Sequence, residues 1–298
     1  MGVATIFDLC VPREDVLKGG VSESDYAANL TAVLSGRAGQ DYTDPKQFFS
    51  NTYPTVGIRE LLKNVCRRLS GREDAISARF RLDTSFGGGK THGLIALVHA
   101  AQSGRQIPSI AEFVDPTFLP SEQVRIAAFD GENADPANGR RMMDGIRAYT
   151  PWGEIAAQLA GKEGYELVRR SDEGRVAPGA DTIAELFSDQ PVLIVLDELG
   201  EYLRKVRHLE GRDQLTGFMK ALFSAIEGAG NAAVVYTLAV RQDGKVQDAF
   251  AQENEFLARQ MDELDVTSRK VVWLLPEQLR LEFLPVFHRL QGRLAAQG

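Results

Sequence analysis

Three successive glycines followed by lysine and threonine, Gly87 to Thr91, are the residues of this chain best suited to holding phosphate groups. Such glycines let the backbone curl tightly, so that several N–H groups can donate to phosphate oxygens in one small concavity. Lys90 would neutralise the β- and γ-phosphates of a nucleotide, and Thr91 would offer its hydroxyl to Mg²⁺. The residues predicted to bind the cofactor are Ser85, Phe86, Gly87, Gly88, Gly89, Lys90, Thr91 and His92.

The loop departs from the common pattern G-x-x-x-x-G-K-[ST], because Thr84 stands where that pattern has its first glycine. Taken alone, a glycine-rich turn is as consistent with a structural bend as with a nucleotide site. The flanking segments favour the site. A short apolar run at residues 80–83 precedes the loop, and apolar residues with helical spacing follow it at residues 93–101. Strand, loop and helix is the order that a phosphate-binding loop requires.

An unbroken apolar run that ends in two acidic residues, at residues 191–198, is the second chemical motif. Such a run is typical of a strand buried on both faces of a parallel sheet, and it has the form of a Walker B motif. Adjacent carboxylates at the end of a buried strand are costly unless a cation or a reacting water lies beside them. We expect Asp197 to bind Mg²⁺ together with Thr91, and Glu198 to deprotonate the attacking water. The alternative is a solvent-exposed strand end that begins a helix cap.

Five segments are predicted to form the strands of one sheet, at residues 80–83, 124–130, 191–198, 232–239 and 270–275. Helical patterns separate these segments, so a parallel α/β sheet flanked by helices is favoured, with the ligand at the carboxyl ends of the strands. Asp130, at the end of its own strand, is predicted to begin a turn with Gly131 rather than to join the site. The polar stretch at residues 169–179 is predicted to be an exposed loop.

Three regions are predicted along the chain. Residues 1–75 form a mainly helical N-terminal segment that packs on the core, residues 76–275 form the α/β domain, and residues 276–298 begin an incomplete C-terminal helical region. Within the first region, residues 55–69 have the pattern of an amphipathic helix. Its apolar stripe contains Ile58, Leu61, Leu62, Val65 and Leu69.

Composition excludes several classes of protein. The 298 residues carry a formal net charge of −7, which gives no overall attraction to nucleic acid, and basic pairs such as Arg204-Lys205 are expected to be solvated helix faces. Cys10 and Cys66 stand in different segments, so neither a disulfide framework nor a zinc site is suggested. No apolar run approaches the ~20 residues that a membrane span needs, and the N-terminus lacks signal-peptide features, so a cytoplasmic location without membrane contact is expected.

Several blocks together resemble a known family. They are residues 7–19, 48–55, 82–92, 150–154 and 195–199. The chain resembles the N-terminal ATPase part of a prokaryotic family of predicted AAA-type ATPases, the domain of unknown function 499. In that family the loop Ser-Phe-Gly-Gly-Gly-Lys-Thr-His also lacks the usual first glycine, so Thr84 fits the family pattern.

The resemblance implies a P-loop NTPase of the class with an added catalytic glutamate, the ASCE/AAA-type class, which hydrolyses ATP with Mg²⁺ to drive conformational change. Such domains belong to longer proteins encoded beside DNA methyltransferases and helicases in phage-defence or restriction-like islands. A DNA methyltransferase, a helicase or further copies of the chain are therefore the expected partners. DNA itself is a candidate without a recognisable binding motif. A scaffold that senses nucleotide with little turnover is the alternative function.

AAA-type enzymes also carry a polar residue on the strand beside Walker B, and Thr237 matches that position best. The resemblance implies that its hydroxyl touches the attacking water or the γ-phosphate, whereas a threonine that only packs inside the strand is the alternative. Glu198, Lys90 and Thr237 are thus the predicted catalytic residues. Candidates for an arginine that reaches a neighbouring subunit are Arg241, Arg259 and Arg269.

Overall fold

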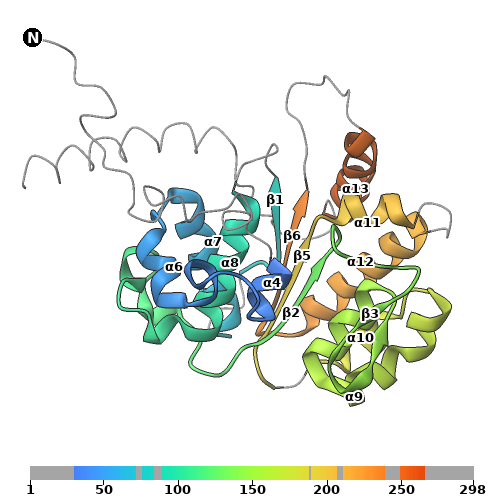
Figure 1. Ribbon diagram of the computed structural model, residues 1–298, viewed down its shortest axis with the longest axis horizontal. Helices are drawn as coiled ribbons and strands as arrows, with labels where there is room; N and C mark the ends of the chain where they lie inside the picture. Colours follow the sequence, from blue (N-terminus) through green and yellow to red (C-terminus); the bar gives the residue numbers. More distant parts are fainter. Residues whose placement is uncertain are drawn as a thin grey trace, which may run out of the picture.

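The computed structural model describes residues 30–71, 76–83, 89–187, 189–206, 211–238 and 249–265. Its centre is a parallel four-stranded sheet in the order β1-β6-β5-β2 (Figure 1). The strands are β1 (Arg79–Asp83), β2 (Arg125–Asp130), β5 (Val192–Asp197) and β6 (Ala232–Leu238). Four of the predicted strands and their parallel arrangement are therefore confirmed. The fifth, at residues 270–275, lies outside the described residues.

Strand residues alternate between two apolar cores, one on each face of the sheet. Leu193 and Val195 of β5 join the core that includes the early helices, whereas Ile194 and Leu196 join the core on the opposite face. Every residue of β5 is buried, which is why its sequence is a continuous apolar run rather than an alternating one.

The blue-to-teal helices of Figure 1 cover the first face of the sheet. They are α4 (Leu30–Leu34), α5 (Gln40–Thr43), α6 (Pro45–Asn51), α7 (Val56–Leu69) and α8 (Lys90–Ser103). The predicted helix at residues 55–69 corresponds to α7, whose first turn is capped by Thr55: the Ile58 N–H donates to the threonine Oγ1 at 3.2 Å. Short 3-10 turns follow α8 at Gly104–Gln106, Ile110–Glu112 and Pro116–Phe118.

The second face carries the later helices, coloured yellow-green to red-brown in Figure 1. They are α9 (Pro151–Gly174), α10 (Ala180–Ala184), α11 (Leu199–Lys205), α12 (Gly211–Gly228) and α13 (Ala249–Asp265). Between β2 and α9 the chain forms a small antiparallel hairpin of β3 (Arg140–Arg141) and β4 (Arg147–Ala148), with the 3-10 turn Met143–Gly145 between its strands. No helix in the described ranges is both long and apolar enough to cross a membrane.

Helix α9 corrects one prediction, because residues 169–174 are helical and not an exposed loop. Two features hold this polar stretch in a helix. Arg169 forms ion pairs along the helix with Glu166 at 2.7 Å and Glu173 at 3.5 Å. Asp172 is fully buried and accepts a hydrogen bond from the Thr150 hydroxyl at 2.5 Å, which ties the end of α9 to its beginning. Only residues 175–179 leave the helix.

Candidate functional site

Three side chains from separate elements meet at the carboxyl ends of β5 and β6. The Thr91 hydroxyl, in the first turn of α8, donates to Asp197 Oδ2 at 3.0 Å, and the Thr237 hydroxyl donates to Asp197 Oδ1 at 2.5 Å. Asp197 is the last residue of β5 and only 3% exposed. The glycine-rich motif and the acidic motif, which are far apart in the sequence, therefore end at the same edge of the sheet.

Burial determines the electrostatics of Asp197. Loss of water around the carboxylate raises its pKa, and the hydrogen bonds from Thr237 and Thr91 together with the charge of Lys90 act in the opposite direction. The nearby Asp130 raises the pKa further. A buried carboxylate in this position gains from a cation beside it, because a positive charge offsets the cost of keeping it ionised.

Glu198 follows directly and has an unusual backbone conformation. Its φ of 51° and ψ of 44° lie in the left-handed region, which residues other than glycine seldom occupy. Two acceptors hold its N–H, Asp197 Oδ1 at 3.1 Å and Thr237 Oγ1 at 3.2 Å. The constraint matters because it fixes the position from which the glutamate side chain leaves the backbone.

The Glu198 carboxyl is half-buried, and its pKa is raised to about 6. Burial is the main cause; the charge of Asp197 adds to it, and Lys90 opposes it. A carboxylate with a pKa closer to neutrality is a stronger base than an ordinary glutamate and remains ionised at neutral pH. The residue is therefore suited to accepting a proton at this edge of the sheet.

Helix α8 begins at Lys90, immediately after Gly89, whose φ is 71°. Glycine adopts this left-handed conformation without a steric penalty, so it lets the chain turn sharply into the helix. The first N–H groups of α8 and the positive end of its dipole lie at the turn. Ser85, Phe86, Gly87 and Gly88 lie outside the described residues, so their role in phosphate binding stays a prediction.

His92, one residue beyond Thr91, lies against the N-terminal helices. Its Nε2 is 3.0 Å from Thr52 Oγ1, and its ring centroid is 4.6 Å from that of Phe48. Burial lowers the pKa of this imidazole, which favours its neutral form. These contacts anchor α8 to α6, and the predicted contact of His92 with a cofactor stays untested.

The remaining predicted residues fall in different places. Thr237 is 1% exposed and is not simply packed in β6, since its hydroxyl bonds both Asp197 and the Glu198 N–H. Arg259, on α13, pairs with Glu255 at 2.7 Å. Arg241 and Arg269 lie outside the described residues. Cys66 is buried as a free thiol, and burial raises its pKa to about 12.

Asp130 begins a turn, as the sequence predicted. Its carboxylate accepts hydrogen bonds from the Glu132 N–H at 3.0 Å and the Asn133 side-chain amide at 2.7 Å. Sequence reasoning missed what this turn touches, because Lys205, assigned to a solvated basic pair, donates to its backbone carbonyls. An exposed lysine that binds main-chain oxygens leaves no pattern in the sequence.

The fold and the site define a parallel α/β protein with hydroxyl, carboxylate and lysine groups at the carboxyl edge of its sheet. The chain matches the family described as the DUF499 N-terminal domain over residues 7–269, and it belongs to that family. The family suggested by the sequence blocks is thereby confirmed. No curated protein matches the chain.

Proposed function

We propose that this protein is a P-loop ATPase of the AAA type that binds ATP and hydrolyses it with Mg²⁺. The observation that carries the proposal is the contact between Thr91 and Asp197, with Glu198 beside it. A glycine–lysine–threonine turn and a strand-end acidic pair at one sheet edge match the phosphate and metal positions of such enzymes.

The donor atoms fit a magnesium ion. Mg²⁺ prefers oxygen ligands and is usually held by one or two carboxylates together with phosphate oxygens of the substrate. The Thr91 hydroxyl and the Asp197 carboxylate provide two such oxygens 3.0 Å apart, at a carboxylate that is almost completely buried. When bound there, the ion would neutralise negative charge that builds up on the phosphates.

The residues of the chain have separate tasks in this proposal. Lys90 and the N-terminal amides of α8 would hold the β- and γ-phosphates by charge and hydrogen bonds. Glu198 would accept a proton from the water that attacks the γ-phosphorus. Thr237 would hold the Asp197 carboxylate and the Glu198 backbone in a fixed relative position. In this proposal the protein accelerates the reaction mainly by positioning the reacting groups and by neutralising charge.

The same arrangement offers a route by which hydrolysis would move other parts of the protein. Glu198 leads directly into α11, and α11 packs on α12 and α13, so a movement at the glutamate would reach the second face of the sheet. We propose that this conformational change acts on a DNA methyltransferase, a helicase or another copy of the chain in a phage-defence or restriction-like system. That setting rests on the family resemblance alone.

Two substitutions test the proposal, with matched controls of the same residue types elsewhere. Lys90→Ala should abolish binding of a fluorescent ATP analogue, whereas Lys220→Ala on the exposed side of α12 should leave it unchanged. Glu198→Gln should keep analogue binding but lower Mg²⁺-dependent phosphate release by roughly a hundredfold or more. Glu185→Gln, at the end of α10, is its control.

The outcomes separate the candidate functions. Parental turnover in Glu198→Gln would remove the glutamate from the mechanism, and absence of nucleotide binding in the parent would overturn the proposal altogether. Binding without phosphate release by the parent, even as its concentration is raised, would favour the nucleotide-sensing scaffold. Stimulation of release by double-stranded DNA would instead place DNA among the partners.

A further inference from the structure

Lys205, the last residue of α11, holds the loop that follows β2. Its Nζ donates to three backbone carbonyls, those of Gly131 at 3.1 Å, Glu132 at 2.5 Å and Ala134 at 2.9 Å. A lysine ammonium has three N–H donors and no acceptor, so one side chain satisfies all of its donors on a single loop. We call residues 131–134 together with the ammonium the lysine clasp.

The clasped loop lies directly against the backbone of Glu198. The Gly131 N–H donates to the Asp197 carbonyl at 2.9 Å, and a Cβ added at Gly131 would lie only 2.0 Å from the Glu198 carbonyl oxygen. Glycine is required at this position because no side chain fits between the two backbones. The loop therefore contacts the main chain on both sides of the bond that joins Asp197 to Glu198.

Glu198 depends on such support, because its left-handed conformation is costly and persists only where its surroundings fix it. Asp197 Oδ1 and Thr237 Oγ1 hold its N–H, and Gly131 packs against its carbonyl. The seven residues of α11 place Glu198 just before the helix and Lys205 at its end, roughly 10 Å apart at 1.5 Å per residue. The lysine therefore reaches back from the end of α11 to the loop whose first residue, Gly131, lies against the Glu198 backbone.

From these contacts we propose that Lys205 is a positioning residue, which holds Glu198 in its catalytic place through the loop at residues 131–134. The inference rests on the proposed ATPase function and adds to it a residue that touches no substrate. Asp130 supports the same loop from its other end, through its hydrogen bonds to the Glu132 N–H and the Asn133 amide. A lysine that served only solubility would have no reason to bind three carbonyls.

The test compares Lys205→Met, Lys205→Arg and the parent, with Lys220→Met as control for loss of an exposed helical lysine. Methionine keeps the apolar stem and removes all three donors, whereas arginine keeps a positive charge and several N–H donors. In Lys205→Met, phosphate release at saturating ATP should fall about tenfold, since a misplaced catalytic group costs turnover, while the Kd for the ATP analogue stays within about twofold. Lys205→Arg should recover most of the turnover, and Lys220→Met should equal the parent.

Hydrogen exchange provides the second measurement, because it reports on the loop without any reaction. The Gly131 and Glu198 amide protons should exchange faster in Lys205→Met than in the parent. Unchanged exchange, or parental turnover in Lys205→Met when the parent is active, overturns the inference and leaves the ATPase proposal intact. A parent that releases no phosphate overturns the ATPase proposal, and the inference falls with it.

Discussion

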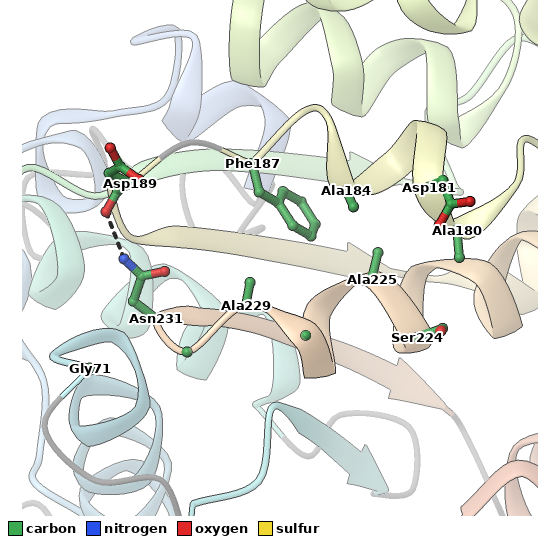
Figure 2. Close-up of a pocket in the computed structure, with 12 residues that line it drawn as sticks. Gly71, Ala180, Asp181, Ala184, Phe187, Asp189, Ser224, Ala225, Ala229 and Asn231 are labelled. Carbon is green, nitrogen blue, oxygen red and sulfur yellow. Dashed lines mark hydrogen bonds between the residues drawn. The ribbon is translucent and has the colours of Figure 1, made fainter.

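The two ends of the central sheet differ in the side chains that the described residues place there. At the amino end, a groove of about 690 Å³ runs between α10 and α12 (Figure 2). Its lining is mostly glycine and alanine, with Phe187 projecting into it and Asp181 exposed at one end. At the carboxyl end, the hydroxyls of half-buried Thr91 and buried Thr237 donate to the buried carboxylate of Asp197.

The two ends thus differ in their polar groups: hydroxyls converge on Asp197 at the carboxyl end, whereas glycine and alanine predominate in the groove. Chemistry needs polar groups that converge and are withdrawn from water, so that their charges act strongly and their pKa values shift. Strand β5 joins both ends: Asp189 lies just before it, in the groove lining, and Asp197 is its last residue. The same residue type is exposed in one place and almost completely buried in the other.

The largest expected effect comes from comparing substitutions of these two aspartates. Asp197→Ala should lower Mg²⁺-dependent phosphate release by on the order of a hundredfold or more, because it removes the proposed metal-binding carboxylate. Asp189→Ala should leave release within about twofold of the parent, since its carboxylate touches nothing in the proposed mechanism. A Mg²⁺ titration of phosphate release measures both. Equal losses in the two variants would contradict the assignment of function to the carboxyl end.

A second pair of substitutions, at Thr237 and Asn231, compares the two ends of β6. Thr237→Val keeps the shape of the side chain but removes the donor to Asp197 and the acceptor for the Glu198 N–H. We expect about a tenfold loss of turnover, with recovery in Thr237→Ser. Asn231, before the same strand, donates to the Asp189 carbonyl at 2.8 Å, as Figure 2 shows.

For Asn231→Ala we expect parental turnover and a loss of at most about 1 kcal/mol in the free energy of unfolding, the usual value of one hydrogen bond. Steady-state kinetics and urea denaturation on both variants separate activity from stability. Turnover lost in Asn231→Ala, or kept in Thr237→Val, would show that the two ends do not differ as described.

Most of the sheet was predictable because buried parallel strands leave a strong pattern. The apolar run of β5 needs burial on both faces, and the alternation of apolar runs with helical patterns favours a parallel sheet. Residues 169–174 were predicted wrongly because a polar and largely exposed stretch was taken as a loop, whereas it is the end of helix α9. Asp172 accepts hydrogen bonds from the Tyr165 hydroxyl and from Thr150, and no local pattern could show the contact with Thr150, more than twenty positions earlier.

Sequence alone located Thr91 and Asp197 through the spacing of each motif within its own segment. Their meeting followed from the rule that ligands lie at the carboxyl ends of parallel strands. The support around Glu198 could not be predicted in the same way. Lys205 binds main-chain oxygens, which every residue possesses, so neither the partner loop nor the contact has a signature in residue types.

The last expected effect concerns stability alone and again separates the two ends. Near the carboxyl end, Glu154 of α9 is 2% exposed and pairs with Arg140 at 3.0 Å. Burial raises the pKa of its carboxyl from 4.5 to about 7; the charge of Arg140 opposes the rise, and Asp130 adds to it. The folded state therefore binds a proton that the unfolded chain has released, and folding loses stability as pH rises through this window.

Relative to Glu154→Gln, which cannot ionise, the parent should lose free energy of unfolding as pH increases from about 4.5 to about 7. The loss should be at most about 1.4 kcal/mol per pH unit, the value of one unit of pKa shift. Urea denaturation of both proteins at several pH values measures the difference between the two curves. Asn231→Ala, a neutral change at the amino end, should differ from the parent by the same amount at every pH. Parallel curves for the parent and Glu154→Gln would mean that Arg140 keeps the buried carboxylate ionised. The pKa of Glu154 would then be close to its value in the unfolded chain, and its burial at the carboxyl end would cost no stability that depends on pH.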